Sequence, residues 1–303
     1  MPFVLEAPPP RSPRHWPVWF GIATLTALAR LPWPIQRRLG RWLGAVLRLL
    51  MRERRRVAMR NLELCFPELD ADARTLLLRE HFAALGICLF EFARAWWGSV
   101  EPLRRGLVLE GLEHIEAAYA AGRGVILVSG HFTTLEACAR MLCEHVPLAG
   151  MYRPYAQAAM EWAVLRGRSR YTAGMFTKRD VRGAVKHLRR GGALWYAPDQ
   201  EPKQDDHVYV PFFGQPARSF TSTHQLARMS GAAVLLFQHM RREDGGYTLR
   251  IHPQLEGFPS RDAHADTVRV MAGIEAAART APAQYLWIHA RFKRRPDGGS
   301  AYA

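Results

Sequence analysis

The stretch VILVSGHFTTLEACARML, residues 125–142, decides the fold class because an apolar, β-branched run leads directly into a glycine, a histidine and a helical pattern. The first half predicts a buried strand and the second half a helix, which Thr133 or Thr134 could cap. Gly130 permits a sharp backbone turn between them. The stretch therefore predicts a strand-to-helix unit of an α/β sheet, with His131 at the carboxyl end of the strand.

Apolar β-rich runs alternate with helical patterns beyond a long helix that starts near residue 70, where Asp70 or Asp72 is available as an N-cap. This alternation predicts an α/β domain around a largely buried mixed sheet flanked by helices, and it argues against a helical bundle or a β-sandwich. The expected strands cover residues 124–130, 147–153, 193–199, 207–213, 232–240, 247–252 and 285–291. The expected helices cover about 111–121, 134–146, 180–190, 219–230 and 264–280.

The chain of 303 residues carries a net charge of +15, and this charge is concentrated near its start. Residues 1–60 hold twelve arginines against two glutamates, which accounts for +10 of the total. An excess of this size indicates an acidic partner, such as nucleic acid, anionic lipid or an acidic protein. Its position in an N-terminal segment favours a membrane surface, and we expect no nucleic-acid partner because aromatic stacking platforms do not accompany the arginines.

Two N-terminal segments predict a membrane anchor. Residues 16–35 are apolar but are interrupted by Arg30 and prolines, so we expect either a marginal span or a segment in the interface. The following segment, residues 39–51, has apolar residues at helical spacing, including Trp42, with arginines among them. This pattern is typical of interfacial helices, although a helix packed on the protein's own core would show it too. We therefore divide the chain into an anchor, 1–60, and a catalytic body, 61–303.

The four cysteines indicate a reducing compartment. They form no C-x-x-C pair and lie inside apolar helical patterns, so a disulfide or zinc framework is not expected. Buried, reduced thiols in a cytoplasmic protein are the simpler interpretation.

His131 and Glu136 are the residues whose chemistry needs explanation. Five positions on one continuous helix would place them about 140° apart, but with His131 in the turn the two side chains could meet across the helix start. A carboxylate on one imidazole nitrogen fixes the tautomer and lets the other nitrogen take a proton from a hydroxyl. The alternative is a capped helix with a structural histidine, and the spacing alone does not decide between them.

Several further segments, in order along the chain, resemble the late acyltransferases of bacterial lipid A biosynthesis, the lauroyl/myristoyl branch of the H-x4-D/E membrane acyltransferases. Together they are far more specific than the histidine–glutamate spacing. The matching pieces are RNLELCFPEL at 60–69, GHFTTLE at 130–136, MYRP at 151–154, WYAPDQE at 195–201, VPFFG at 210–214, LARMSGA at 226–232 and APAQYLWIHARFKRRP at 281–296.

The resemblance implies roles for five residues. His131 would be the catalytic base and Glu136 the carboxylate that orients it. Arg168 would stabilise charge at the reacting carbonyl, and Arg153 would support substrate binding. Asp199 resembles an aspartate near the family's site, where it would position an arginine or a polar group of the substrate, although it could also be a simple cap at the end of a strand. No metal or organic cofactor is implied.

The resemblance also implies the reaction, namely transfer of a fatty acyl group from acyl carrier protein to a hydroxyl of a lipid A precursor at the cytoplasmic face of the inner membrane. The fold would be similar to that of glycerol-3-phosphate acyltransferases. An apolar groove lined by Phe132, Leu135 and Phe212 could receive the acyl chain, although each of these residues could equally belong to the core. Two alternatives remain open: another lipid acceptor such as a glycerophospholipid, and a non-catalytic scaffold that binds anionic lipid.

Overall fold

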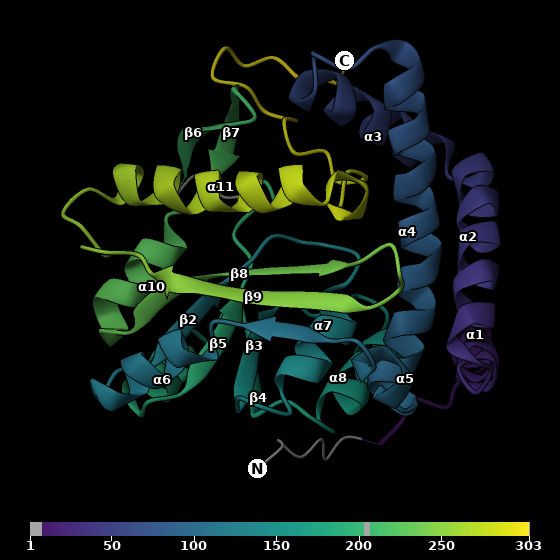
Figure 1. Cartoon of the computed structure of the whole chain (residues 1–303), viewed down its shortest axis with the longest axis horizontal. Coiled ribbons are helices and arrows are strands. Elements are labelled where there is room, and N and C mark those ends of the chain that lie inside the picture. The colour runs from purple at the N-terminus through teal and green to yellow at the C-terminus, as the bar shows by residue number, and fades with distance from the viewer. Residues whose placement is uncertain (1–7, 203–206, 303) are drawn as a thin grey trace.

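A seven-stranded mixed sheet forms the centre of the computed structural model, which describes residues 8–202 and 207–302 (Figure 1). Its strand order is β1-β9-β8-β2-β5-β3-β4, and β9 runs antiparallel to its neighbour β8 while the other pairs are parallel. The seven strands are β1 (Val108–Glu110), β2 (Val125–Val128), β3 (Leu148–Tyr152), β4 (Gly174–Thr177), β5 (Ala193–Tyr196), β8 (Ala233–Arg241) and β9 (Tyr247–Gln254). A separate hairpin pairs β6 (Val208–Phe212) with β7 (Gln215–Ser219).

Helices cover both faces of the sheet and one side of it. The N-terminal helices are α1 (Trp16–Leu28), α2 (Trp33–Leu50), α3 (Arg52–Cys65) and α4 (Ala71–Trp97), and those of the α/β region are α5 (Glu101–Arg104), α6 (Leu112–Ala120), α7 (Leu135–Leu142), α8 (Ala158–Arg168), α9 (Val181–Arg189), α10 (Ser222–Ser230) and α11 (Ala263–Thr280). Two short 3-10 helices, η1 (Pro13–His15) and η2 (Pro282–Gln284), complete the set. Figure 1 shows α11 lying across one face and α4 standing at the side, with α2 outside it.

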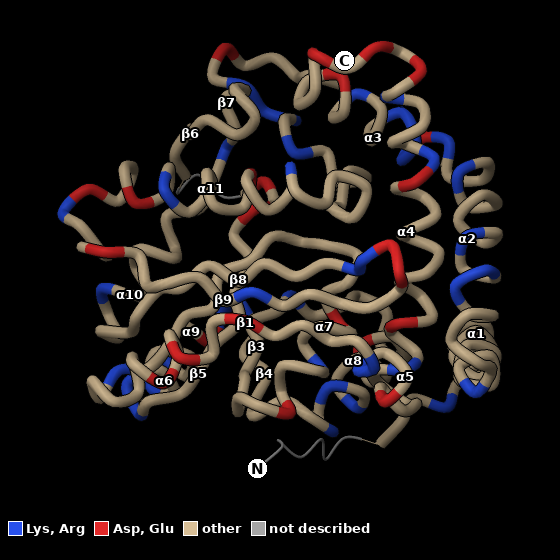
Figure 2. The backbone as a smooth tube through the Cα atoms, in the orientation of Figure 1, with Lys and Arg blue, Asp and Glu red and all other residues tan. Residues whose placement is uncertain are grey.

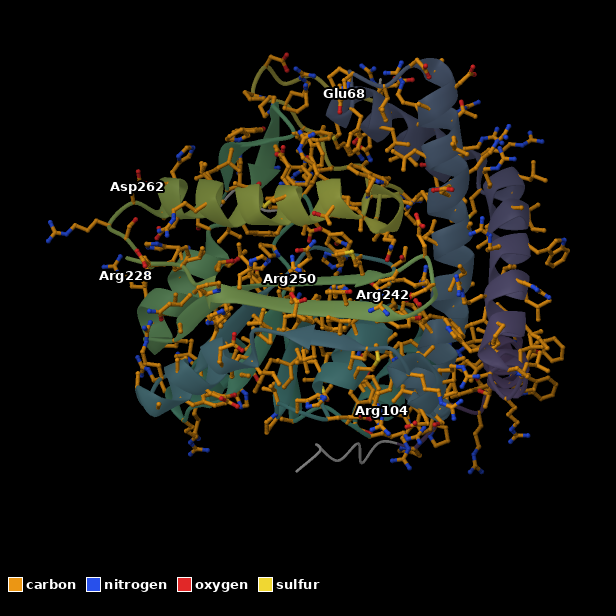
Figure 3. All side chains as sticks on the ribbon, in the orientation of Figure 1. Glu68, Arg104, Arg228, Arg242, Arg250 and Asp262 are labelled. Carbon is orange, nitrogen blue, oxygen red and sulfur yellow. The ribbon has the colours of Figure 1, made fainter. Side chains whose placement is uncertain are left out.

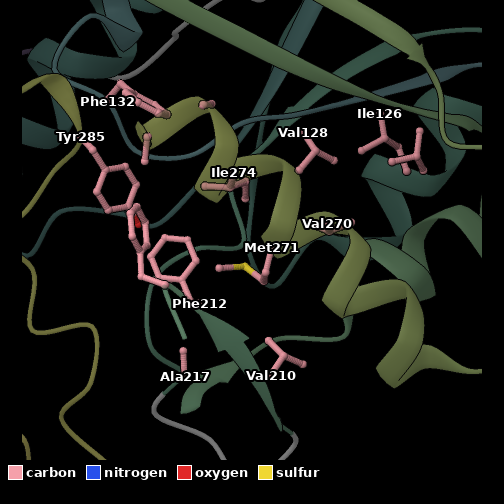
Figure 4. Close-up of a cluster of buried hydrophobic side chains, with 14 of the residues drawn as sticks. Ile126, Val128, Phe132, Val210, Phe212, Ala217, Val270, Met271, Ile274 and Tyr285 are labelled. Atoms are coloured by element: carbon pink, nitrogen blue, oxygen red, sulfur yellow. The ribbon is translucent and has the colours of Figure 1, made fainter. Parts of the chain in front are cut away.

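The core consists of two large clusters, one on each face of the sheet. The first joins the sheet to α9, α10, α11 and the β6–β7 hairpin, and the second joins it to α6 and α7. Strand β2 is buried on both faces, as its uninterrupted apolar sequence predicts. Figure 4 shows Phe132, Phe212 and Tyr285 packed with Ile274 and Met271 of α11, which brings the core of the first cluster up to the His131 turn.

The predicted α/β class is confirmed, and the errors concern edge and peripheral elements. Helix α4 begins after Asp70, whose side chain accepts a hydrogen bond from the amide of Ala73 at 2.7 Å. Residues 285–291 do not form a strand, because only a single bridge joins Tyr285 to Phe132. The expected strand at 207–213 is β6, which lies in the hairpin outside the central sheet. Strands β1, β4 and β7 and helices α3, α5 and α8 were not predicted; the strands and α5 are short, and short elements carry weak periodicity.

The register of two parallel strands positions the site. Val128 of β2 pairs with Tyr196 of β5, and the two strands run in the same direction. His131 and Asp199 each follow three residues after these partners, so both lie beyond the same carboxyl edge of the sheet. Neighbouring strands in a sheet are about 5 Å apart, so equal offsets bring the two side chains within reach of each other.

Close packing of α2 against α4 depends on three glycines. A β-carbon on Gly86 would overlap the carbonyl oxygen of Gly40, and one on Gly44 would overlap the carbonyl oxygen of Phe82. The two helices therefore approach to a distance that only glycine permits at these positions. This contact ties the N-terminal segment to the body of the protein.

We expect the substitution Gly86→Ala to destabilise the protein by about 1–3 kcal/mol, because the added methyl group must push α2 away from α4. Gly21→Ala is the matched control, since Gly21 lies in α1 with no neighbour within 4 Å of the added β-carbon. That control should be neutral or stabilising by up to about 1 kcal/mol through helix propensity. Urea denaturation followed by circular dichroism measures both. Equal unfolding midpoints for the two variants would contradict the close approach.

The predicted N-terminal anchor corresponds to α1, α2 and part of α3, with residues 1–7 outside the described residues. Within 8–202 and 207–302, no helix is both long enough and apolar enough to cross a membrane. The predicted boundary after residue 60 lies within α3, and the division into anchor and body stays a prediction. The face predicted as one apolar stripe is divided: Leu39, Leu43 and Leu47 pack against the body, while Trp42 and Leu50 are 68% and 74% exposed.

Candidate functional site

The side chain of His131 is bound to Asp199. The imidazole Nδ1 lies 2.6 Å from Asp199 Oδ1, and the backbone amide of His131 donates to Asp199 Oδ2 at 2.8 Å. Tyr285 donates its hydroxyl to the same carboxylate at 2.9 Å. Nε2 of His131 has no hydrogen-bond partner among the described residues. The side chain is 28% exposed, so this nitrogen is available to a substrate.

The environment of Asp199 keeps it ionised. Burial would raise its pKa, but the charge of His131 and the hydrogen bonds from His131 and Tyr285 outweigh burial and lower the pKa to about 2. An ionised carboxylate can only accept, so the neutral imidazole must carry its proton on Nδ1. Nε2 is then the basic nitrogen, and the pair has the arrangement of a general base held by a carboxylate.

The expectation that Glu136 orients His131 is wrong in this structure. Glu136 is the second residue of α7, and its buried carboxylate accepts hydrogen bonds from Trp96 of α4 at 2.6 Å, from Tyr171 at 2.8 Å and from Arg168 Nε at 3.0 Å. The turn places His131 on the side of β5, whereas the helix directs Glu136 toward α4 and α8. Asp199, expected near the site with an uncertain role, is the carboxylate that holds the imidazole.

Glu136 and Arg168 form a nearly buried ion pair, with 4% and 15% of their side chains exposed. Burial opposes the ionisation of Glu136, yet the charge of Arg168 and the hydrogen bonds from Arg168, Trp96 and Tyr171 lower its pKa. For Arg168, burial is likewise outweighed by Glu136, which raises the pKa of the guanidinium. Nε and Nη2 bind Glu136, and Nη1 of Arg168 has no partner among the described residues. The pair therefore holds one guanidinium nitrogen in a fixed position with spare donor capacity.

An apolar pocket adjoins this ion pair, since Glu136 and Arg168 both line it. It encloses about 380 Å³, part of it open to solvent, and its walls come from α7, β3 and β5 and from the segment around Tyr171. Trp195 lines the pocket and meets the ring of His131 edge to face, with ring centroids 6.2 Å apart. Of the three residues suggested for an acyl groove, Leu135 lines this pocket, whereas Phe132 and Phe212 are buried in the core.

A second, smaller pocket is lined by the His131–Asp199 pair itself. It spans about 240 Å³, including space open to solvent, and its lining includes His131, Asp199, Asn61 and His289. Burial lowers the pKa of His289 to about 4, so its neutral ring accepts a hydrogen bond from the amide of Glu201 at 3.1 Å. The pocket at the His131–Asp199 pair thus contains several polar side chains, whereas the apolar pocket meets His131 only through Trp195.

The remaining candidate, Arg153, follows β3 at the same edge of the sheet, is exposed, and makes no ion pair with a described residue. Elsewhere on the surface many arginines are paired: Figure 3 shows Arg104, Arg242 and Arg250, which bind Glu101, Asp244 and Glu110 respectively. No group of three or more histidine, cysteine or acidic side chains in the described part of the chain is arranged to hold a metal ion.

Sequence reasoning did not identify Tyr285, Trp96 or Tyr171 as parts of the site. Tyr285 belongs to the segment predicted as a strand. Trp96 lies in the last turn of α4, where the sequence pattern indicates only burial. Equal spacing from two apolar runs was the available signal for the pairing of His131 with Asp199, but it required knowing that β2 and β5 are neighbours.

Comparison with known proteins adds the family relationship. A profile for the family described as bacterial lipid A biosynthesis acyltransferase matches residues 7–294. The chain is 38% identical over 291 residues to the lipid A biosynthesis palmitoleoyltransferase of Escherichia coli (strain K12), with 95% of each chain covered. Identity to the lauroyltransferase of that organism is 38% over 288 residues and 94% of each chain.

More distant similarity extends to two other proteins. The myristoyltransferase of Escherichia coli is 25% identical over 295 residues, which cover 95% of this chain and 90% of that one. Among solved structures, the 1-acyl-sn-glycerophosphate acyltransferase of Thermotoga maritima aligns with a TM-score of 0.36 and 16% identity, over 80% of this chain and 97% of that chain. The finer expectation of a glycerol-3-phosphate acyltransferase-like fold stays a prediction.

Proposed function

The chain belongs to the bacterial lipid A biosynthesis acyltransferase family, and from this premise we propose that it transfers a fatty acyl group from the thioester of acyl carrier protein to a hydroxyl of a lipid A precursor. The single observation that supports the mechanism best is the short bond between His131 and Asp199, which leaves Nε2 of the histidine free. The product is an acyloxyacyl ester, and no cofactor takes part.

The reaction proceeds in two steps. Nε2 of His131 takes the proton of the acceptor hydroxyl while the oxygen attacks the thioester carbonyl, which forms the new C–O bond. The tetrahedral oxyanion then collapses, the C–S bond breaks, and the leaving thiolate takes the proton back from the imidazolium. Asp199 stabilises the imidazolium between the two steps, which is the role of the carboxylate in a catalytic triad.

Arg168 supplies the charge that stabilises the oxyanion in this proposal. Glu136 holds its Nε and Nη2 and leaves Nη1 as the free donor. The backbone amides of His131 and Thr133 cannot serve as donors, because they are bound to Asp199 and to the carbonyl of Gln284. The apolar pocket beside Trp195 receives the acyl chain, and Arg153 at the sheet edge contacts an acidic group of a substrate.

The function is tested by incubating the purified enzyme with a panel of acyl carrier protein thioesters and a tetra-acylated lipid A precursor, with the product mass as readout. We expect a precursor that gains one acyl group. A glycerophospholipid acceptor offered in parallel separates the alternative acceptor class. Absence of transfer to either acceptor would favour the non-catalytic scaffold.

We also propose that α1 and α2 place the enzyme at the cytoplasmic face of the inner membrane, in contact with anionic lipid. Large apolar side chains are exposed on both helices, and arginines accompany them along α2 and α3 (Figure 2). Ile35, Trp42 and Leu49 are seven residues apart and share one outward face of α2. An apolar row flanked by cations fits the boundary between acyl chains and anionic headgroups.

The double substitution Trp42→Gln and Leu49→Gln should weaken binding to vesicles that contain phosphatidylglycerol by about tenfold or more, because two large apolar side chains no longer enter the bilayer. Leu76→Gln is the matched control, since Leu76 is 58% exposed but lies on α4. Co-sedimentation measures the partition of each variant. Equal loss in the control would indicate a general effect of surface hydrophobicity and would contradict the assignment to α2.

A further inference from the structure

The turn that carries His131 is held at both ends by one buried histidine of β8. His239 Nε2 lies 3.1 Å from Oγ of Ser129, the residue before the turn, and its Nδ1 lies 2.9 Å from Oγ1 of Thr134, the N-cap residue of α7. All three side chains are almost fully buried, with at most 2% exposed. His239 therefore connects the end of β2 to the start of α7 across the residues between them.

Aromatic packing fixes the ring of His239 in place. Phe132, next to His131, meets it edge to face at 5.4 Å, and Phe237 lies against it at 5.1 Å between ring centroids. Burial lowers the pKa of His239 to about 3, so the ring is neutral in the range where the enzyme works. A neutral imidazole has one donor and one acceptor, and each of its two hydroxyl partners must fit one of them.

The directions of these hydrogen bonds follow from the hydroxyl groups. Ser129 Oγ donates its proton to the carbonyl oxygen of Gly130 at 3.2 Å, so it accepts from His239 Nε2. His239 Nδ1 is then the acceptor, and Thr134 Oγ1 donates to it. The competing acceptor for Thr134, the carbonyl of His239, is at 3.5 Å and is too distant for a strong bond. The chain of donors runs from Thr134 through His239 and Ser129 to the peptide that joins Gly130 to His131.

We propose that His239 is a positioning residue for catalysis: with Ser129 and Thr134 it forms a brace that holds the His131 turn in register with Asp199. The proposal rests on the function of His131 given above. Either Thr133 or Thr134 was expected to cap α7; Thr134 occupies the cap position, but its hydroxyl makes no capping bond and binds His239 instead. The Thr134 hydroxyl donates to His239 and not to the start of the helix, which indicates that it serves the His131 turn more than the helix end.

The brace acts on alignment and not on substrate binding. His131 must keep its Nδ1 on Asp199 while Nε2 faces the acceptor hydroxyl, and small displacements of a catalytic group reduce the rate strongly. Removing one hydroxyl leaves a buried nitrogen of His239 without a partner, which loosens the connection at that end. We expect kcat to fall while KM for both substrates stays close to the wild-type value.

Thr134→Val and Thr134→Ser are the matched pair that tests the brace. Valine keeps the shape and loses the hydroxyl, whereas serine keeps the hydroxyl and loses a methyl group. Thr134→Val should lower kcat about tenfold with KM unchanged, and Thr134→Ser should stay within about twofold of the wild type. Ser129→Ala removes the other connection and should resemble Thr134→Val, which keeps the test valid if one variant folds poorly.

A spectroscopic readout separates alignment from a loss of folded protein. The proton between His131 Nδ1 and Asp199 gives a low-field resonance in NMR spectra, which the His131→Ala variant assigns. This resonance should weaken or shift in Thr134→Val and remain in Thr134→Ser. Equal effects of valine and serine, or an unchanged resonance and kcat in Thr134→Val, would overturn the brace. Neither outcome bears on whether His131 is the base, because that depends on the activity of His131→Ala.

Discussion

Replacing His131 by alanine is expected to lower kcat/KM for acyl transfer by about 10²- to 10⁴-fold, because no other described side chain on the sheet edge offers a free basic nitrogen beside Asp199. His289 lies in the adjacent pocket, but its Nε2 accepts from the amide of Glu201 and its pKa is about 4. It is a poor substitute for the missing imidazole. The measurement is the initial rate of product formation by mass spectrometry, at saturating acyl carrier protein thioester and with the acceptor well below its KM, so that the rate reports kcat/KM for the acceptor.

His289→Ala is the control for this experiment. It enlarges the same pocket and removes an imidazole, but it leaves the bond between His131 and Asp199 in place. We expect at most about a tenfold effect from it. The thermal unfolding midpoint of His131→Ala should fall moderately, because the buried Asp199 loses the imidazole but keeps the His131 backbone amide and the Tyr285 hydroxyl as donors, and the variant should still unfold cooperatively. A well-folded His131→Ala enzyme with normal turnover would refute the base assignment.

The sequence predicts the location of the site but not the pairing of His131 with Asp199. An apolar run that ends in Gly130 and His131 already indicates a polar group at the carboxyl end of a strand. The same argument applies to Asp199 after β5. The sheet order brings these two residues together, because β2 and β5 are neighbours in the sheet. Along the chain, 64 residues separate Val128 from Ala193, and hydrophobic periodicity does not indicate which distant strands pair.

Glu136 shows why a short sequence distance misleads. It is close to His131 along the chain, but one side chain belongs to a turn and the other to a helix whose direction is fixed by α4 and α8. The residues that decide its orientation, Trp96 and Tyr171, lie 40 and 35 positions away. Helix α2 shows the same limit. Part of its apolar surface packs against α4, and no described residue covers the rest.

The substitution Asp199→Asn should lower kcat by about 10²- to 10⁴-fold, although it only replaces one carboxylate oxygen by an NH2 group. The amide can donate to Nδ1 of His131, which favours the tautomer with its proton on Nε2, and this nitrogen is then no longer a base. The measurement is kcat for acyl transfer, together with the nitrogen chemical shifts of ¹⁵N-labelled histidine, which report the tautomer directly. A variant that keeps the wild-type tautomer and rate would show that Asp199 does not orient the base.

The pKa of Asp199 predicts how stability changes with pH in this variant. The pKa is lowered from 3.8 to about 2 in the folded protein, so the carboxylate contributes stability above about pH 4 that is lost as the pH falls through about 2. The lowering corresponds to about 2 kcal/mol. The stability difference between wild type and Asp199→Asn, measured by urea denaturation, should therefore shrink between pH 4 and pH 2. A constant difference would mean that the carboxylate is not held by His131 and Tyr285.

Glu136→Gln distinguishes the two carboxylates, since the sequence predicts Glu136 as the residue that orients the histidine and the structure places Asp199 on it. Glu136 and Arg168 form one unit, so Glu136→Gln, Arg168→Met and the double variant should lower kcat by similar factors. Glu136→Gln should leave the tautomer of His131 unchanged, because its carboxylate binds Trp96, Arg168 and Tyr171. Each factor is measured at the same substrate concentrations as for Asp199→Asn. If kcat of the double variant fell by the product of the two single factors, Glu136 would act independently of Arg168. The assignment of Glu136 to Arg168 and of Asp199 to His131 would then be wrong.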